Sequence, residues 1–264
     1  MQPAESNRPK CGAAPDRSGR QVIKIGGHEI DDPLFLEQLV DLVRGLPVAP
    51  ILVHGGGKEI TEWQDRLGLK PVKIQGLRVT DADSLRLTEM ILSGLVNKRL
   101  VRMMALAGIR AIGISGVDGH LCEAEKLRLP DADLGFVGTV SRVNTGFIVP
   151  LLDAGYLPVI SPLSLGRDGQ VYNVNADTVA QALAEALQVA TLVFITDVPG
   201  VKIGGEVVDL LPIGDVDRHI TSGEITGGMI PKVRAAVGAV QKGVGSVMIT
   251  HARNFIEGKG TRIQ

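Results

Sequence analysis

The chain has 264 residues, of which 44% are hydrophobic, and it carries 28 Lys and Arg against 29 Asp and Glu. This length is enough for one large α/β domain or for two lobes that share a sheet. A formal net charge of −1 gives no electrostatic reason to expect nucleic acid or an anionic membrane as a partner. The only cysteines are Cys11 and Cys122, which argues against a disulfide scaffold or a zinc site and fits a reducing compartment.

Residues 1–20 are polar and are interrupted by three prolines and two glycines. We therefore predict a flexible N-terminal extension here, followed by a single domain over residues 21–264. The extension has no apolar stretch typical of a signal peptide, and no apolar run in the chain is long enough to span a bilayer. We expect a soluble cytoplasmic protein without a membrane partner.

Residues 22–28 predict a short buried strand that ends at Gly26 and Gly27. Lys24 lies in the middle of this apolar run, although a charged amine is rarely buried without a partner. Because two glycines let an anion approach the backbone closely, Lys24 is a candidate phosphate contact. The alternative is an edge-strand lysine whose amine reaches solvent before an ordinary turn.

A second strand, glycine turn and helix follow over residues 50–67. Gly55, Gly56 and Gly57 precede the helix, and the free N–H groups of its first turn favour an anion. The alternative is a tight turn that needs positive φ and binds nothing. The sequence contains no G-x-x-x-x-G-K-[ST] motif, so a nucleotide would not be held by a Walker A loop.

Residues 72–80 predict a hairpin that turns at Gly76 and carries Arg78 on its second arm. The fork of an arginine suits a carboxylate, although a lone surface arginine is the commoner case. Residues 83–107 then predict a long helix whose apolar stripe is too wide for one contact face. We therefore expect a homodimer built on this helix, with two copies crossing at Gly94.

Strands and helices alternate along the rest of the chain. The predicted strands are residues 109–115, 157–160, 191–195 and 246–250. The predicted helices are residues 145–155, interrupted at Pro150, then 178–187, and one that opens near Lys232 and runs through Lys242. Residues 121–143 predict hairpins or an excursion from the sheet, and Gly204 and Gly205 a hairpin tip. The alternation predicts an α/β fold with a mainly parallel sheet covered on both faces.

Two isolated lysines, Lys24 and Lys232, lie beside glycine turns, and Asp177 lies at the start of a helix. Phosphoryl transfer needs positive charge around the migrating group and little covalent help from the protein. If the acceptor is a carboxylate, it is already ionised at neutral pH and needs no general base. On the residues alone, Asn175 and Asp177 are better explained as helix caps than as catalytic groups.

Six motifs occur in an order that resembles the amino acid kinase family, from residue 22 to the C-terminus. They are Lys24-Ile-Gly-Gly, Val53-His-Gly-Gly-Gly, Gly76-Leu-Arg-Val-Thr-Asp, Asn173-Val-Asn-Ala-Asp, Thr196-Asp-Val-Pro-Gly-Val and Gly227-Gly-Met-Ile-Pro-Lys. The resemblance is strongest to the branch that makes an acyl phosphate from N-acetyl-L-glutamate and ATP in arginine biosynthesis. It implies a three-layer αβα sandwich, with an N-lobe for the acyl substrate over about residues 21–165 and a C-lobe for ATP over about residues 166–264.

The resemblance also implies roles for individual residues. Lys24 and Lys232 match the lysines that neutralise the transferring phosphoryl group, and Asp177 matches the acid that orders both of them. Gly26 and Gly27 match a turn that contacts the phosphoryl oxygens. The residues that match substrate contacts are Gly56, Gly57, Arg78 and Asn173, with Arg78 pairing a substrate carboxylate. The residues that match the nucleotide site are Asp197, Val198, Pro199, Gly200, Val201, Lys202, Glu224, Ile225 and Thr226. In this family Mg²⁺ is held largely by phosphates and water, so no protein ligand for a metal is predicted.

Two alternatives remain open at this stage. Residues 94–100, together with residues 113–119, also resemble a sister branch whose substrate is aminoadipate or glutamate attached to a small carrier protein. The chain could also be a catalytically silent member that binds ATP or a regulatory partner. Both lysines and Asp177 are present, which argues against a silent member, since a pure binding module does not need that set.

Overall fold

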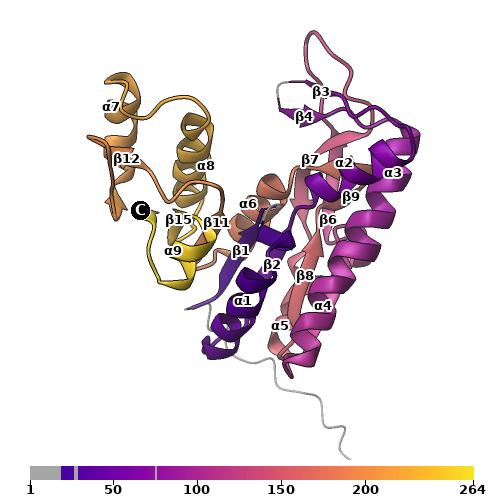
Figure 1. Cartoon of the computed structure of the whole chain (residues 1–264), viewed down its shortest axis with the longest axis horizontal. Helices are drawn as coiled ribbons and strands as arrows, with labels where there is room; N and C mark the ends of the chain where they lie inside the picture. The colour runs from indigo at the N-terminus through magenta and orange to yellow at the C-terminus, as the bar shows by residue number, and fades with distance from the viewer. Residues whose placement is uncertain (1–18, 27–28, 75) are drawn as a thin grey trace, which may run out of the picture.

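A computed structural model describes residues 19–26, 29–74 and 76–264, so the predicted extension lies almost entirely outside the described residues. An eight-stranded sheet formed by these residues runs through the whole molecule, in the order β14-β16-β15-β11-β1-β2-β8-β5 (Figure 1). In chain order its strands are β1 (Gln21–Ile25), β2 (Ile51–His54), β5 (Ala111–Ser115), β8 (Leu157–Ser161), β11 (Thr191–Ile195), β14 (Leu210–Leu211), β15 (Ser246–Thr250) and β16 (Thr261–Ile263).

The strand β1 lies at the middle of the sheet and pairs in parallel with β2 on one side and β11 on the other. The pairs β2–β8, β5–β8 and β11–β15 are also parallel, whereas β16 runs antiparallel to β15 at one edge. The prediction of a mainly parallel sheet is therefore confirmed. Strands from the first part of the chain lie on one side of β1 and strands from the last part on the other.

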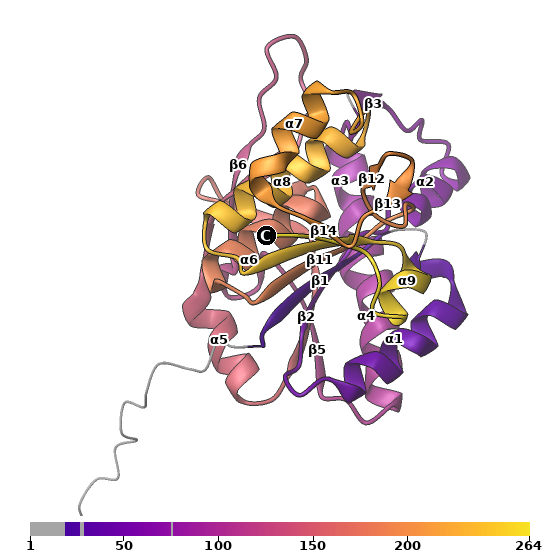
Figure 2. The same ribbon diagram turned by 90° about the vertical axis from the view of Figure 1, so that its left-hand side faces the viewer.

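Helices cover both faces of this sheet, which confirms the three-layer αβα sandwich (Figure 2). The α-helices of the described residues are α1 (Pro33–Gly45), α2 (Gly57–Arg66), α3 (Ala82–Glu89), α4 (Asn97–Leu106), α5 (Thr145–Asp153), α6 (Ala176–Leu187), α7 (Val216–Thr221), α8 (Met229–Gln241) and α9 (Ala252–Ile256). Short 3₁₀ turns span Glu29–Asp31, Asp118–His120 and Ile213–Asp215. The interruption predicted at Pro150 is wrong, because α5 continues through this residue.

Alternation along the strands builds a separate apolar core on each face. In β1, Val22 belongs to the core beneath α5, α6 and α8, while Ile23 and Ile25 belong to the core beneath α1, α2, α4 and α9. In β11, Leu192 and Val193 divide between the two cores in the same way. The strands therefore read as continuous apolar runs because both of their faces are buried.

Smaller strands form excursions above the main sheet. The strands β6 (Cys122–Lys126), β7 (Val137–Val143), β9 (Leu163–Gly166) and β10 (Val171–Val174) close into a small barrel. The hairpin β3 (Lys73–Ile74) with β4 (Leu77–Arg78), and the hairpin β12 (Lys202–Ile203) with β13 (Glu206–Val207), are antiparallel. These pairings confirm the predicted excursion over residues 121–143 and both predicted hairpins.

The predicted long helix of residues 83–107 is present, but it is not uniformly α-helical. A π-helical segment, η2 (Met90–Val96), separates α3 from α4, and Gly94 lies within it. Figure 1 shows this helix along the outer edge of the molecule. Its exposed apolar side chains include Met90 at 63%, Leu95 at 44% and Leu106 at 83% exposure. Among the described residues, no helix is both long enough and apolar enough to cross a bilayer.

Candidate active site

A polar cavity of about 270 Å³ lies where β1 and β2 end, beneath the β3–β4 hairpin and next to β10. Its lining includes Lys24 and the residues predicted to bind the substrate, which are Gly56, Gly57, Arg78 and Asn173. These residues come from distant parts of the chain, and the sheet brings their elements together. The structure therefore gathers all four predicted substrate contacts around one space.

A second cavity of similar volume, about 270 Å³, is lined by Asp177 and Lys232 and by Phe194 at the end of β11. Asn175 lines both cavities. Lys24 Nζ lies 2.8 Å from Asp177 Oδ1, so an ion pair joins a residue of the first cavity to a residue of the second. The three predicted catalytic residues thus lie around two adjoining spaces.

The position of Lys24 follows from the alternation of β1. Val22 faces the core beneath α6, so Lys24, two residues later, points to the same side of the sheet. There it meets the first turn of α6, where Asp177 is found. The lysine side chain is only 16% exposed, and the half-buried Asp177 carboxylate supplies the counter-charge that a buried amine requires. The interpretation of Lys24 as an edge-strand lysine is wrong.

Asn175, rather than Asp177, caps α6. The Asn175 side-chain oxygen accepts a hydrogen bond of 2.8 Å from the backbone N–H of Asp177. Asp177 Oδ1 is a buried oxygen that is not in hydrogen-bond geometry with any described group, and its contact with Lys24 is an ion pair. The residue-based prediction of two caps is therefore confirmed for Asn175 and wrong for Asp177, because the Asp177 carboxylate is turned toward the lysine.

The glycine turn after β2 places the start of α2 against the first cavity. Gly56 adopts φ of 155°, and a Cβ at this position would overlap the side chain of Leu92 from the π-helical segment. The carbonyl of Gly56 accepts the first helical hydrogen bond, from Ile60 N at 3.0 Å, which leaves the N–H groups of the first turn without helical partners. The helix dipole and these donors favour an anion in the cavity.

Arg78 is held against α2 by a fan of hydrogen bonds. Its guanidinium donates to Gly57 O at 2.8 Å, to Thr61 Oγ1 at 2.7 Å and to Gln64 Oε1. Burial lowers the pKa of Arg78, yet a guanidinium stays charged at neutral pH. The chain therefore orients a cation beside the helix start, ready for a carboxylate.

Sequence reasoning missed two residues of this cavity and its surroundings. Lys73 lines the cavity and lies opposite Arg78 in the β3–β4 register, which adds a further cation. Gln64 is 1% exposed and connects Arg78 to Ser84, to which its amide donates at 3.1 Å. A signal for Gln64 existed, since it follows Ile60 by one helical turn on the buried side of α2.

The predicted nucleotide segments lie on the far side of β1, toward the β12–β13 hairpin (Figure 1). Ser222 and His219 hold Glu224 by hydrogen bonds of 3.0 Å and 2.7 Å, and these bonds lower the pKa of Glu224, as does a hydrogen bond to the backbone of Gly204. The hairpin tip and residues 224–226 are therefore adjacent. Gly228, two residues after Thr226, lines the second cavity beside Lys232.

Gly26 and Gly27 form the predicted glycine turn after β1. Gly26 follows β1 and is buried, and a Cβ there would overlap the carboxylate of Glu29. Gly27 lies outside the described residues. The described residues contain no group of three or more His, Cys, Asp or Glu side chains placed to hold a metal ion.

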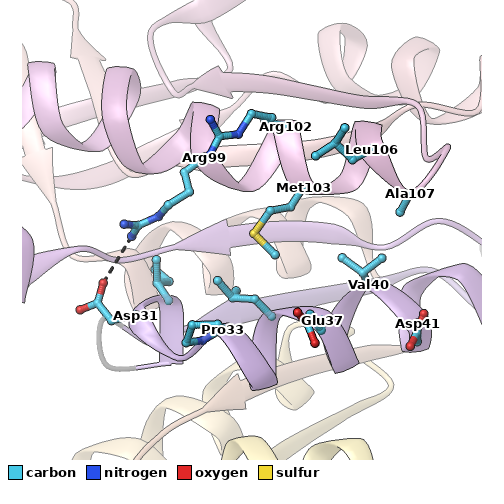
Figure 3. Close-up of a pocket in the computed structure, with 12 residues that line it drawn as sticks. Asp31, Pro33, Glu37, Val40, Asp41, Arg99, Arg102, Met103, Leu106 and Ala107 are labelled. Atoms are coloured by element: carbon cyan, nitrogen blue, oxygen red, sulfur yellow. Dashed lines mark hydrogen bonds and ion pairs between the residues drawn. The ribbon is translucent and has the colours of Figure 1, made fainter.

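A larger cavity, about 710 Å³, lies between α1 and α4, away from these residues (Figure 3). Val40 and Met103 contribute apolar surface, and an ion pair of 3.3 Å joins Arg99 to Asp31 at one end. None of the predicted site residues lines it. We place the candidate active site in the two smaller cavities because they gather the charged groups and the helix start.

His54, the last residue of β2, is fully buried behind the glycine turn. Its Nδ1 lies 2.8 Å from Gly55 O, and its Nε2 lies 3.2 Å from Asn97 Nδ2. The pKa of His54 is lowered from 6.5 to about 4, mainly by burial; the bond to Gly55 acts to raise it, and the charges of Arg99 and Lys98 contribute to lowering it. The imidazole is therefore neutral at physiological pH.

Comparison with known proteins identifies the class of this fold and site. The sequence model of the amino acid kinase family matches residues 19–251. The chain belongs to the amino acid kinase family.

Relatives that match over nearly their whole length are named acetylglutamate kinase. The chain is 47% identical over 242 residues to acetylglutamate kinase of Chloroflexus aurantiacus, an alignment that covers 91% of this chain and 95% of the relative. It is 44% identical over 252 residues to acetylglutamate kinase of Methanopyrus kandleri, covering 92% of this chain and all of the relative.

Solved structures share the fold. A Streptococcus mutans protein, smu.665, superposes with a TM-score of 0.77 at 32% identity, covering 93% of this chain and 98% of its own. N-acetylglutamate synthase of Neisseria gonorrhoeae, solved with coenzyme A and N-acetyl-glutamate, superposes with a TM-score of 0.81 at 22% identity, over 94% of this chain and 60% of its own. The likeness to the synthase concerns the fold alone.

The buried His54 predicts an acid-sensitive stability. The unfolded chain protonates this imidazole near pH 6.5 and the folded chain only near pH 4, so the stability it contributes is complete above pH 6.5 and is lost as the pH falls toward 4. The difference corresponds to roughly 3 kcal/mol. We expect urea unfolding between pH 7 and pH 4.5 to show a smaller pH dependence in His54→Asn than in the unmodified protein. His120→Asn, at an exposed position, is the control. Equal pH dependence in His54→Asn and the unmodified protein would contradict this assignment.

Proposed function

We propose that this chain is an acetylglutamate kinase, which transfers the γ-phosphoryl group of ATP to the side-chain carboxylate of N-acetyl-L-glutamate. The observation that carries the proposal is the cavity that gathers Lys24, Arg78 and the start of α2 at the end of β1 and β2. Full-length relatives named acetylglutamate kinase, at 43–47% identity, support the choice of substrate. The product is N-acetyl-L-glutamyl 5-phosphate, an intermediate of arginine biosynthesis.

The transfer is a single displacement at phosphorus. A carboxylate oxygen of the substrate attacks the γ-phosphorus, the bond from γ-phosphorus to the β–γ bridging oxygen breaks, and ADP leaves with that electron pair. No proton has to be removed, because the acceptor is already ionised at neutral pH. The protein therefore has to bring two anions together and stabilise the charge on the transferring group.

Lys24 and Lys232 supply that charge in this proposal. Lys24 reaches the boundary of the two cavities from β1, and Lys232 reaches the second cavity from the first turn of α8. The ion pair with Asp177 limits the rotamers of Lys24, so its ammonium is positioned before the substrates bind. Asp177 acts as a positioning residue here and not as a base, because its Oδ1 already faces the lysine.

The acyl substrate occupies the first cavity. Arg78 places its positive charge beside the carboxylate that does not react, and Asn173 lines the same space, where its side-chain amide can bond the acetamido group. The Asn173 amide also donates to Thr80 Oγ1 at 3.1 Å, which orients it. Free glutamate would bring an ammonium into a space lined by Lys24, Lys73 and Arg78, so the acetylated amine fits better.

ATP lies over the C-terminal half of the sheet in this proposal, near residues 197–202 and 224–226. Mg²⁺ would arrive with the phosphates, since four of the charged residues that line the two cavities are cations and the one carboxylate among them, Asp177, faces Lys24. These residues do not fit a metal held by the protein itself, because Mg²⁺ prefers several oxygen ligands. The N-lobe and C-lobe then correspond to the strands on either side of β1.

The proposal extends to assembly and location. Met90, Leu95 and Leu106 leave apolar surface on the outer side of the long helix, and a second copy crossing at Gly94 would cover it. In this proposal the protein acts in the cytoplasm as a homodimer.

Acyl phosphate formation tests the function directly. With ATP, Mg²⁺ and N-acetyl-L-glutamate, we expect a product that hydroxylamine traps as the hydroxamate. Parallel reactions with glutamate, aspartate and aminoadipate should give much lower kcat/KM. The proposal fails if aminoadipate or glutamate is the better substrate, if a carrier protein is required, or if no substrate is turned over.

The role of Lys24 predicts a loss confined to the chemical step. Lys24→Ala should lower kcat by about 10²–10³, comparable to losing one preorganised donor to the transition state, with a much smaller change in the KM for ATP. Lys70→Ala, at an exposed lysine before β3, is the matched control and should leave kcat unchanged. An unaltered kcat in Lys24→Ala would rule out the proposed mechanism.

Gly94 predicts a test of the homodimer. Gly94→Leu should weaken self-association, because a bulky side chain would separate two helices at their crossing point. Light scattering at micromolar concentration should show a dimer for the unmodified protein and a larger monomer fraction for the variant. Glu62→Leu, on the exposed side of α2, is the control for adding an exposed leucine. It is preferred to Gly68→Leu, because Gly68 is also exposed but has a positive φ. A monomer in the unmodified protein would overturn the proposal.

A further inference from the structure

The glycine turn that faces the acyl substrate, residues 55–57, does not fix its own backbone conformation. Three consecutive glycines can adopt many backbone conformations, and Gly56 requires an unusual one, with φ of 155°. A binding turn must nevertheless present its N–H groups in one direction. The neighbouring side chain of His54 provides the constraint.

The peptide between Gly55 and Gly56 is fixed by contacts on the side away from the first cavity, with β1 and with the His54 ring. Gly55 N donates to Ile25 O at 3.0 Å, at the end of β1, and Gly55 O lies 2.8 Å from His54 Nδ1. In a trans peptide the carbonyl of Gly55 and the N–H of Gly56 point in opposite directions. The bond to the His54 ring therefore turns the Gly56 N–H away from the ring, and Gly56 lines the first cavity.

Asn97 determines which ring nitrogen of His54 carries the proton. Lys98 Nζ donates to Asn97 Oδ1 at 3.0 Å, and Asn97 Nδ2 donates to Val159 O at 2.8 Å, so the orientation of the amide follows from its partners. The same Nδ2 lies 3.2 Å from His54 Nε2 and 3.4 Å from Ile114 O, so its second proton goes to the nearer Nε2, which accepts it. The proton is left on Nδ1, where it can donate to Gly55 O.

We propose that His54 is a positioning residue for phosphoryl transfer: its ring, kept in the Nδ1–H tautomer by Asn97, aims the Gly56 N–H at the carboxylate of the acyl substrate. This inference rests on the proposed function, which places that carboxylate in the first cavity. His54 is not itself a catalytic residue, since it is fully buried and does not line either cavity.

The arrangement also connects the turn to the rest of the fold. Asn97 is the first residue of α4, directly after the π-helical segment, and its amide bonds the backbone of β8. Gly113 in β5 leaves room for this contact, because a Cβ there would overlap Asn97 Oδ1 and lie 2.8 Å from Lys98 Nζ. The pair thus accounts for the motif residues around positions 97 and 113, which the catalytic set leaves unexplained.

Binding measurements on matched His54 variants test the proposal. His54→Asn can keep a donor at the place of Nδ1, whereas His54→Leu cannot donate to Gly55 O. By titration calorimetry, we expect His54→Leu to raise the Kd for N-acetyl-L-glutamate at least tenfold, the size of one lost hydrogen bond to a charged group, and to change the Kd for ATP by less than about threefold. His54→Asn should recover most of the affinity. Ser246→Ala, at a buried site at the opposite end of the sheet, controls for general destabilisation.

The outcomes separate this inference from the proposed function. An unmodified protein that neither binds nor phosphorylates N-acetyl-L-glutamate would refute the proposed function. An active unmodified protein with unchanged affinity in His54→Leu, or with equal losses for both ligands, would refute the role of His54 alone. If His54→Leu does not fold, ¹⁵N NMR of the imidazole in the unmodified protein decides, since a proton on Nε2 would overturn the proposal and one on Nδ1 would support it.

Discussion

The ion pair between Lys24 and Asp177 is the interaction on which the site depends. It joins the central strand of the sheet to the first turn of α6, and it lies at the boundary of the two cavities. An amine that is only 16% exposed needs a counter-charge, and the α6 carboxylate supplies it while leaving the ammonium next to the first cavity. The same contact therefore stabilises a buried charge and positions it for a transferring phosphoryl group.

Around this pair, the fold concentrates positive potential by several independent means. The start of α2 contributes free N–H groups, the β3–β4 hairpin contributes Lys73 and Arg78, and α8 contributes Lys232. Two of these groups have a buried partner: Gln64 orients Arg78, and His54 contacts the turn before Gly56. These partners keep the donors aligned before the substrate binds. Losing such a partner, or protonating His54, would lower the stability of the folded protein.

Much of the fold was predictable because its signals are local. The apolar runs of β1, β2 and β11 and the glycines that end the first two of them indicated a parallel sheet buried on both faces, and the structure confirms it. The resemblance to the amino acid kinase family rested on six ordered motifs, and the family match confirms it. The local reading was wrong at Pro150, which α5 accommodates, and it did not distinguish the π-helical turns around Gly94 from α-helix.

The sequence by itself determined which residues could carry charge or admit an anion, because residue type and local period suffice for that. Only the tertiary structure decided how those residues pair. In the sequence, Asp177 resembles a helix cap. In the structure, the alternation of β1 places Lys24 2.8 Å from Asp177, and Asn175 caps the helix. The helical spacing placed Gln64 on the buried side of α2, but neither Gln64 nor His54 revealed its partner, since those partners lie 14 and 43 residues away along the chain. Contacts of that range depend on how the layers pack, which no short stretch of sequence specifies.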